Sequence, residues 1–330
     1  MDRNYHVFSD GRIERKDDTI RLVTDGDEKK HLPIENAEAL FVHGQIDFNT
    51  RLISFLNDQG VALHVFGWED YYAGSIMPER GQTSGQTVVS QVQAYDDTEH
   101  RRELAASIVS GSIHNMRSNA VYYDSRDRDL EAEISALEQA ASRIDDGLPI
   151  NELMGIEATA RKAYYRTFNE ILPEEFRLSN REYNPPPNEI NSLISFGNSL
   201  VYANCVSAIR ATALDPAISY LHEPGERRYS LSLDLADLFK PILADRVLFR
   251  LVNRGQITRD DFETELGSCL LTEHGRETYS KAFEETLERT VDHPNLNRKV
   301  SYQYLLRLEA YKLKKHLLAG ERYEPFKRWW

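Results

Sequence analysis

Two aspartates spaced three residues apart form the clearest chemical signal in this sequence of 330 residues. Asp234 and Asp237 lie in the stretch LSLDLADLFKP, and their spacing places them one turn apart on a single helix face. Two like charges in this arrangement repel each other by roughly a few tenths of a kcal/mol unless a cation lies near them. The pair therefore indicates a metal site as readily as it indicates the usual enrichment of acidic residues in the first turn of a helix.

One histidine and one glutamate could complete such a site. His222 lies in YLHEPG, a turn before the helix of the two aspartates; turns between rigid elements often hold ligands, although a single turn histidine is more often a surface residue. Glu157 shares a helix face with Leu153, Ala160 and Tyr164, where a carboxylate would need a cation or a hydrogen-bond donor. The alternative is a glutamate at the edge of the apolar stripe with its head in water. Spacing alone predicts an acidic, histidine-containing metal site of unproven geometry.

Other catalytic patterns are absent from the sequence. It contains neither GxxxxGK[ST] nor a GxGxxG after a strand, so a nucleotide cofactor is not expected. It contains no GxSxG and no HExxH, and its two cysteines, Cys205 and Cys269, cannot form a Cys-rich zinc site or a disulfide framework. These absences argue against the serine hydrolases and the zinc proteases that carry those motifs.

Charge is unevenly distributed along the chain. The formal net charge of −13 disfavours a nucleic-acid partner when taken globally, but residues 298–330 carry nine basic and three acidic residues interleaved with aromatic residues. Such a composition suits phosphate contact combined with base stacking. An amphipathic helix with a solvated basic face is the equally weighted alternative. Lys312 and Lys315 in this segment, and Arg228 and Lys240 near the aspartates, are the candidate phosphate-contacting residues.

The elements that must position these residues change in character near residue 85. Short strands are predicted at 5–8, 19–24, 39–42 and 61–66, together with one helix that Asn49 could cap and Gly60 could end. Residues 81–90 read as a connector that is rich in Gly, Thr, Ser and Gln. We expect an N-terminal β domain at 1–85, a connector at 86–96 and a helical catalytic domain at 97–330.

Apolar periodicity of about three and a half residues predicts successive helices after the connector, at 98–123, 127–144, 150–171, 188–213, 231–253, 275–291 and 298–318. The fold class is therefore α+β, a small antiparallel β domain followed by a larger all-helical domain. The prolines at 185–187 break the chain, and Asn188 can cap the helix that follows. The uncharged stretch 190–209 is long enough to span a bilayer, but its Asn and Ser residues favour a buried helix. Charges throughout residues 1–18 argue against a signal peptide, so a cytoplasmic location without membrane association is expected.

Three stretches give a resemblance to a known family. They are residues 184–200 (NPPPNEINSLISFGNSL), 220–225 (YLHEPG) and 227–241 (RRYSLSLDLADLFKP). In this order they resemble the CRISPR-adaptation integrase family, the first of the CRISPR-associated proteins (Cas-one). The resemblance is greatest to the type I-B form. The resemblance covers essentially the whole chain. It implies the same two-domain fold, an N-terminal β domain joined to a helical one.

The resemblance also assigns roles to the candidate residues. Glu157, His222 and Asp237 match the three metal ligands of the family, and Asp234 matches a nearby acidic position that supports the site. Many close relatives have Glu where Asp237 stands, and the shorter arm would move the metal by about a methylene without removing an oxygen ligand. A histidine with two carboxylates suits Mg²⁺ or Mn²⁺, and the imidazole favours Mn²⁺.

The implied activity is that of a metal-dependent DNA endonuclease and integrase. In the family, the 3′-hydroxyl of a short captured DNA attacks a phosphodiester at the edge of a CRISPR repeat, and water as nucleophile would cut DNA at the same site. The implied partners are double-stranded DNA, a second copy of the chain in a homodimer, and the small ferredoxin-like second CRISPR-associated protein. Two alternatives remain, a non-catalytic DNA-binding scaffold of the same complex and a metal-dependent hydrolase of a small phosphoester. A scaffold would not require the three ligand heads to lie together, whereas catalysis requires them within about 5 Å of one ion.

Overall fold

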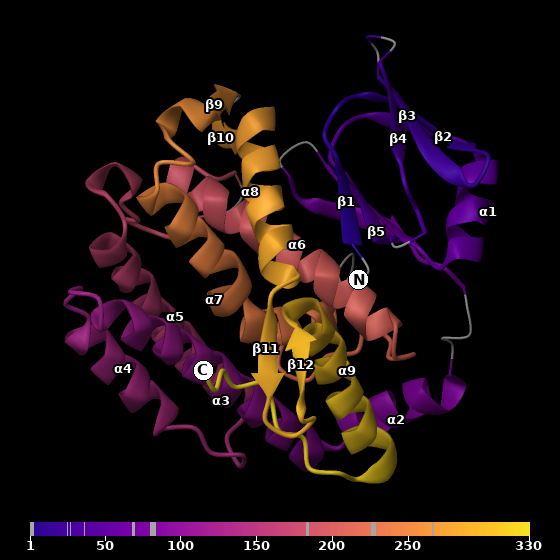
Figure 1. Cartoon of the computed structure of the whole chain (residues 1–330). Helices are drawn as coiled ribbons and strands as arrows, with labels where there is room; N and C mark the ends of the chain where they lie inside the picture. Colours follow the sequence, from indigo (N-terminus) through magenta and orange to yellow (C-terminus); the bar gives the residue numbers. More distant parts are fainter. Residues whose placement is uncertain are drawn as a thin grey trace.

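The computed structural model describes residues 3–24, 26, 28–35, 37–67, 70–79, 84–182, 185–225, 229–265 and 267–330. Figure 1 shows a strand-rich N-terminal part beside a larger helical part, as the α+β prediction requires. Arg228 and Asn184, which the sequence singles out, lie outside the described residues.

Among the described residues, two four-stranded sheets make up the N-terminal part. One sheet has the order β1 (Arg3–Val7), β5 (Ala37–Val42), β7 (Ala62–Phe66) and β8 (Tyr72–Ile76). The other has the order β4 (Lys29–Leu32), β3 (Thr19–Thr24), β2 (Gly11–Lys16) and β6 (Ile46–Phe48).

The antiparallel prediction for this part is only half right. β2–β3, β3–β4 and β7–β8 are antiparallel, but β1–β5, β5–β7 and β2–β6 are parallel. A parallel pair needs a crossover between its strands, and α1 (Thr50–Gln59) supplies part of the one between β5 and β7. As predicted, the Asn49 side chain caps this helix by accepting from the Leu52 amide, and Gly60 ends it at φ 74°.

The helical part contains α2 (Gly85–Asp96), α3 (Thr98–Asp124), α4 (Glu131–Ala141), α5 (Ile150–Ile171), α6 (Glu189–Arg210), α7 (Ser230–Asn253), α8 (Glu273–Leu287) and α9 (Tyr302–Ala319). Single-turn 3₁₀ segments lie at Glu174–Phe176 and Arg259–Asp261. The segment expected to be a connector is thus the helix α2, and the division of the chain into domains stays a prediction.

This part is not all-helical, contrary to the prediction. A hairpin of β9 (Phe262–Glu265) and β10 (Ser268–Leu271) follows α7, and a second hairpin of β11 (Thr290–His293) and β12 (Arg298–Ser301) precedes α9. The second hairpin takes residues that the sequence assigned to the ends of two helices, because cross-strand pairing stabilises them as strands.

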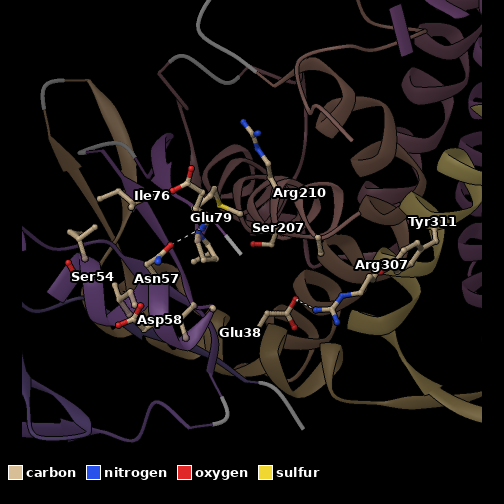
Figure 2. A pocket seen from close by; sticks show the side chains of 18 residues that line it. Glu38, Ser54, Asn57, Asp58, Ile76, Glu79, Ser207, Arg210, Arg307 and Tyr311 are labelled. Carbon is tan, nitrogen blue, oxygen red and sulfur yellow. Dashed lines mark hydrogen bonds and ion pairs between the residues drawn. The ribbon is translucent and has the colours of Figure 1, made fainter. Parts of the chain in front are cut away.

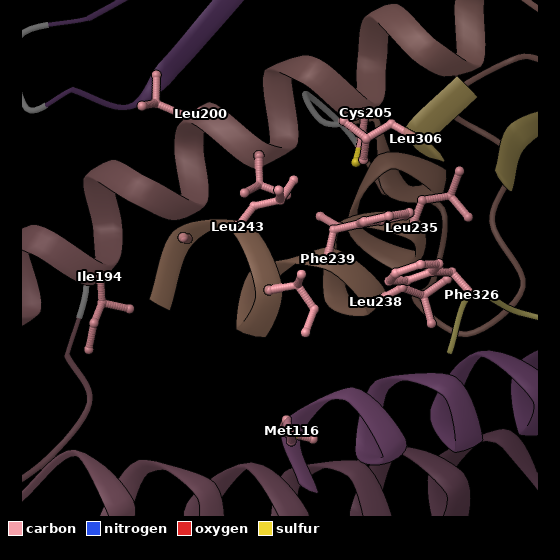
Figure 3. Packing of buried hydrophobic residues seen from close by; sticks show 14 of the residues in the cluster. Met116, Ile194, Leu200, Cys205, Leu235, Leu238, Phe239, Leu243, Leu306 and Phe326 are labelled. Atoms are coloured by element: carbon pink, nitrogen blue, oxygen red, sulfur yellow. The ribbon is translucent and has the colours of Figure 1, made fainter. Parts of the chain in front are cut away.

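The long helices α6 and α7 pack together at the centre of the helical part. Leu200 and Cys205 of α6 and Leu235 and Leu243 of α7 are almost completely buried in one continuous core (Figure 3). By length and composition α6 could cross a membrane, but 72% of its most apolar window is buried inside the protein. Burial in a core explains its hydropathy, as the sequence predicted. The capping of α6 by Asn188, which accepts from the Asn191 amide, is also confirmed.

The C-terminal tail returns to α7 after α9 ends. The Phe326 ring stacks on Phe239 of α7 with centroids 4.7 Å apart, and both rings are buried. The side-chain amide of Asn115 on α3 donates to the carbonyls of Leu238 and Phe326 at 2.8 and 3.0 Å. The tail and α3 therefore fix the turn of α7 that carries Asp237.

Candidate metal centre

Two helices and one turn bring the predicted site residues together. Glu157 lies on α5, and its helix-face neighbours Leu153, Ala160 and Tyr164 are buried. Asp237 lies on α7, a helix whose residues are buried on nearly all of its sides, and Asp237 itself is 5% exposed. His222 lies in the turn before α7, and its side chain is 25% exposed.

Arg161 links the two carboxylates. It lies one turn after Glu157 on α5, donates from Nε to Glu157 Oε1 at 2.5 Å, and places Nη2 beside both Glu157 Oε1 and, at 3.2 Å, Asp237 Oδ1. Lys240 Nζ lies 2.7 Å from the same Asp237 oxygen. Glu157 and Asp237 thus lie on either side of one guanidinium nitrogen.

The cations determine the charge state of this cluster. Burial by itself would raise the pKa of Asp237, but Arg161 and Lys240 lower it well below its ordinary value. Burial would likewise lower the pKa of Arg161, but Asp237 and Glu157 raise it well above its ordinary value. The carboxylate and the guanidinium are both ionised at neutral pH.

Asp234 anchors the histidine. It is completely buried; its Oδ1 accepts from His222 Nδ1 at 2.8 Å and from the His222 amide at 3.0 Å, and its Oδ2 accepts from the amides of Tyr220 and Leu221. Because Nδ1 is used in this way, Nε2 is directed to the cluster and lies 3.9 Å from Asp237 Oδ2. Burial lowers the pKa of His222, but the hydrogen bond to Asp234 and the charges of Asp237 and Asp234 together outweigh it and raise the pKa above the ordinary value.

The donor chemistry of this cluster fits a divalent cation. Two carboxylates and one imidazole nitrogen are ligands of Mg²⁺ and Mn²⁺, and a carboxylate bonded to the far nitrogen of the ring is the common support of a metal-ligating histidine. Within the part of the chain that the structure describes, no three His, Cys, Asp or Glu side chains lie close enough to enclose an ion as they stand. Arg161 lies between two of the three candidates, so a bound metal would have to displace its guanidinium.

Residues 5–285 match the family described as CRISPR associated protein Cas1. The chain belongs to the Cas1 family. It is 55% identical to the CRISPR-associated endonuclease Cas1 of Haloferax volcanii over 99% of both chains.

Solved structures agree with this family assignment. A Cas1 protein from Thermotoga maritima superimposes with a TM-score of 0.87 and 36% identity, over 98% of this chain and 99% of the other. A casposase bound to its integration product has a TM-score of 0.86 over 99% of this chain and 93% of the other, but at 19% identity it shows the shared fold alone. The type I-B assignment stays a prediction.

Sequence reasoning missed Arg161, the residue that joins the two carboxylates of this Cas1 protein. A signal was available, because Glu157 and Arg161 are four residues apart and such pairs meet on one helix face. The spacing could not show that the guanidinium also reaches Asp237, 76 positions further along the chain.

The basic positions expected to contact DNA differ in their surroundings. Lys240 belongs to the cluster itself. Lys312 Nζ lies 2.6 Å from Glu309 Oε2 and donates to the carbonyl of Glu324, whereas Lys315 Nζ lies 3.8 Å from Glu321 Oε2. The aromatic residues Tyr302, Tyr323 and Phe326 of the same segment are buried in the core. Contact of these lysines with DNA stays a prediction.

A separate cavity of about 890 Å³ lies between the N-terminal sheet and helices α6 and α9 (Figure 2). Arg307 donates to Glu38 across it at 3.0 Å, and the Asn57 side chain accepts from the Glu79 amide at 2.8 Å. None of its described lining residues belongs to the cluster of Glu157, His222 and Asp237.

Proposed function

We propose that this Cas1 protein is a metal-dependent DNA endonuclease and integrase of CRISPR adaptation. It would join short captured DNA to a repeat through attack of a 3′-hydroxyl on a phosphodiester. Family membership and the endonuclease name of the Haloferax volcanii relative support this function. The observation that carries it is that Arg161 bridges Glu157 and Asp237, while His222 Nε2 lies 3.9 Å from Asp237.

Glu157, His222 and Asp237 would hold Mg²⁺ or Mn²⁺. When bound, such an ion lowers the pKa of an attacking hydroxyl and neutralises charge on the phosphate. Asp234 would keep His222 in the tautomer that presents an unprotonated Nε2 to the metal, because its carboxylate accepts a hydrogen bond from Nδ1.

Arg161 and Lys240 would act on the phosphate of the DNA. Both are held at the cluster by carboxylates that a divalent cation would neutralise, which frees their N–H groups for another anion. A phosphodiester undergoing transesterification gathers negative charge, and cationic donors near it stabilise that charge. Among the lysines expected to contact DNA, Lys240 would therefore bind the scissile phosphate, whereas Lys312 and Lys315 would bind the strand elsewhere.

Convergence of the cluster favours catalysis over a purely scaffolding role. A scaffold that binds DNA through its surface does not need an acidic residue as buried as Asp234 to fix the ring of His222. Burying that carboxylate is unfavourable unless it is fully hydrogen-bonded, and here it accepts four bonds within one short turn.

The partners proposed are double-stranded DNA, a second copy of the chain and the small ferredoxin-like second CRISPR-associated protein. For the homodimer, the N-terminal sheets offer exposed edges, and β8 at one edge ends at Ile76, which is 37% exposed, while Tyr71 beside it is 58% exposed. Exposed edges with apolar side chains need covering, which supports an interface made by the N-terminal part. Light scattering at micromolar concentration tests this, and a particle of 38.0 kDa would contradict it.

A joining and cutting assay tests the function. Purified protein and its small partner are mixed with captured-length DNA and a repeat-containing duplex in Mn²⁺, Mg²⁺ or EDTA. His222→Ala should abolish joining and cutting while the fold is retained, and Asp97→Asn, which changes an exposed helix cap, should not. Metal-independent activity or unchanged activity of His222→Ala would overturn the proposal.

A further inference from the structure

A second, very different cluster of charge lies where α3, α7 and α8 meet. A pocket of about 340 Å³ is lined there by five arginines, and its described lining residues include no carboxylate. The arginines are Arg126, Arg246, Arg250, Arg254 and Arg289. In a chain whose net charge is −13, such a concentration of unbalanced positive charge requires a reason.

None of these five arginines forms an ion pair within the described part of the chain, although Arg101, Arg117 and Arg161 elsewhere do. Their charges act on one another instead. Burial and the neighbouring Arg289 lower the pKa of Arg250, although the Glu285 carboxylate acts in the opposite direction. Burial and Arg246 likewise lower the pKa of the adjacent Arg328 to about 10. The Glu285 carboxylate offsets this repulsion only in part, and within the described residues it forms no ion pair with any of the five arginines.

An aromatic floor holds the guanidinium groups in place. The Tyr122 ring has Arg126 3.6 Å and Arg246 4.3 Å from its centroid, and Arg328 5.5 Å away. Tyr123 packs edge-on against the buried Phe249 at 5.2 Å. Guanidinium groups over an aromatic face keep their N–H edges available for an outside acceptor.

The positive surface extends beyond this pocket. A neighbouring hollow of about 370 Å³ shares Arg250, Arg254 and Arg289 with it, and adds Lys281 and one carboxylate, that of Glu285. The two hollows thus form one elongated basic groove, hereafter the arginine groove.

The arginine groove is separate from the candidate metal centre. Arg246 follows Asp237 by nine residues on α7, which is about 2.5 helical turns, so the two side chains leave opposite sides of the helix about 14 Å apart along its axis. A ligand in the arginine groove therefore does not occupy the cluster of Glu157, His222 and Asp237.

We propose that the arginine groove binds successive phosphates of a nucleic-acid strand, as a second contact on the side of α7 opposite the metal centre. Arginine is the side chain best suited to phosphate, because its planar fork donates two parallel hydrogen bonds. A single phosphate would leave most of five guanidinium charges unbalanced, whereas a strand spaces its charges along both hollows. The choice of a nucleic acid rests on the proposed function, while the anion site rests on the groove itself.

The test is equilibrium binding of DNA in the full-length His222→Ala background, which prevents cutting. Arg254→Gln/Arg289→Gln removes two exposed arginines with no side-chain hydrogen bond among the described residues, and Arg246→Gln probes the aromatic floor. Arg166→Gln, an exposed arginine paired with Glu133, is the matched control. The double variant should reduce the slope of log K against log salt by about two and weaken binding about ten- to a hundredfold at low salt, and the control should change neither.

An unchanged slope and affinity in both groove variants would overturn the proposal. So would loss of tripolyphosphate binding without any loss of DNA binding, because the occupant would then be a small anion. The joining assay with His222 intact distinguishes failure of the groove proposal from failure of the proposed function. If joining is absent but the slope falls, the function fails and the groove stands; if joining proceeds and the slope is unchanged, the groove proposal alone fails.

Discussion

Asp234 holds His222 by two hydrogen bonds to a single oxygen, one from the backbone amide at 3.0 Å and one from ring Nδ1 at 2.8 Å. The second carboxylate oxygen accepts from the two preceding amides. One buried side chain therefore sets both the path of the turn and the direction of the imidazole.

Replacing Asp234 with Asn should damage stability and activity together. The amide nitrogen of Asn cannot accept, so at least one backbone donor is left unpaired in the interior, at about 1–3 kcal/mol. Loss of the support for His222 should lower metal affinity and DNA joining about 10- to 100-fold. Urea unfolding and metal titration measure the two effects. Asp97→Asn is the control, since Asn caps a helix about as well as Asp and the change should alter neither stability nor activity appreciably; full activity in Asp234→Asn would contradict the positioning role.

Arg161→Gln should make the stability of the protein depend more strongly on divalent metal. Without the guanidinium, Glu157 and Asp237 repel each other in the metal-free protein, so its melting temperature in EDTA should fall below that of the wild type. Adding Mn²⁺ should restore stability, by about 2.7 kcal/mol when the ion is at a hundred times its dissociation constant. Differential scanning calorimetry in EDTA and Mn²⁺ measures the difference. Equal melting temperatures for the variant with and without Mn²⁺ would rule out these carboxylates as ligands.

His64 should make the fold sensitive to mild acid. Burial between β7 and α6 lowers the pKa of His64 from 6.5 to about 3, so the folded protein keeps the ring neutral while the unfolded chain takes up a proton below pH 6.5. The stability that this group contributes is complete above pH 6.5 and declines as the pH falls toward 3, by about 3 kcal/mol at pH 4. His43, whose pKa burial lowers to about 4, acts in the same direction.

The effect of His64 is isolated by comparing variants. His64→Gln removes the titrating group, so the loss of unfolding free energy between pH 7 and pH 4 should shrink by about 3 kcal/mol. His274→Gln, at a side chain that is 77% exposed, should leave the profile unchanged. Parallel pH profiles for wild type and His64→Gln would show that the ring is protonated in the folded state.

Phe326→Ala should loosen the helix that carries Asp237. The ring is buried against Phe239, and its removal should destabilise the protein by about 3–5 kcal/mol through the cavity it leaves. Hydrogen exchange should increase at the α7 amides around residue 237, whereas Tyr311→Ala, at a residue that is 40% exposed, should cost less than about 1 kcal/mol. Unaltered exchange in α7 would show that the tail does not support the site.

Local signals in the sequence were sufficient for the helices and their ends. Asn49, Gly60 and Asn188 act as caps where their residue types predict them, because capping depends only on neighbours in the chain. The parallel pairing of β1 with β5 depends instead on residues more than thirty positions apart. No local pattern fixes such a partner. The hairpin at Thr290–Ser301 was missed for another reason: its strands are only four residues long and lie next to helices whose periodicity was extended over them.

In the candidate site, too, the sequence predicts what depends on neighbouring residues and misses what depends on distant ones. Spacing placed Asp234 and Asp237 on one helix, but nothing in the spacing joins them to Glu157, which is about eighty positions away on α5; that link came from the family resemblance. Arg161 escaped notice because its two ion pairs combine a local partner with a distant one. The arginine groove escaped as well, because two of its five arginines lie on α7 and the other three in the segments that follow α3, α7 and α8, and their total charge is hidden by the acidic average of the chain.

Lys240 and the pair Lys312 and Lys315 should differ in their effect on DNA binding. Lys312 and Lys315 already have carboxylate partners on their own segment, and neither partner is replaced when a metal binds. Lys312→Ala/Lys315→Ala should therefore reduce the slope of log K against log salt by less than about one per lysine. Lys240 is paired with Asp237, the proposed metal ligand, so its charge becomes available to phosphate only when the ion is bound.

The measurement compares Lys240→Ala with the wild type in EDTA and in Mn²⁺, on a phosphorothioate duplex that resists cutting. In Mn²⁺ the variant should lose about one unit of slope, and in EDTA it should lose almost none. The double lysine variant should behave alike in both solutions, because its ion pairs do not involve the metal centre. A slope loss for Lys240→Ala that is the same with and without Mn²⁺ would separate this lysine from the metal. A full two-unit loss for the double variant would instead place the DNA on the C-terminal segment.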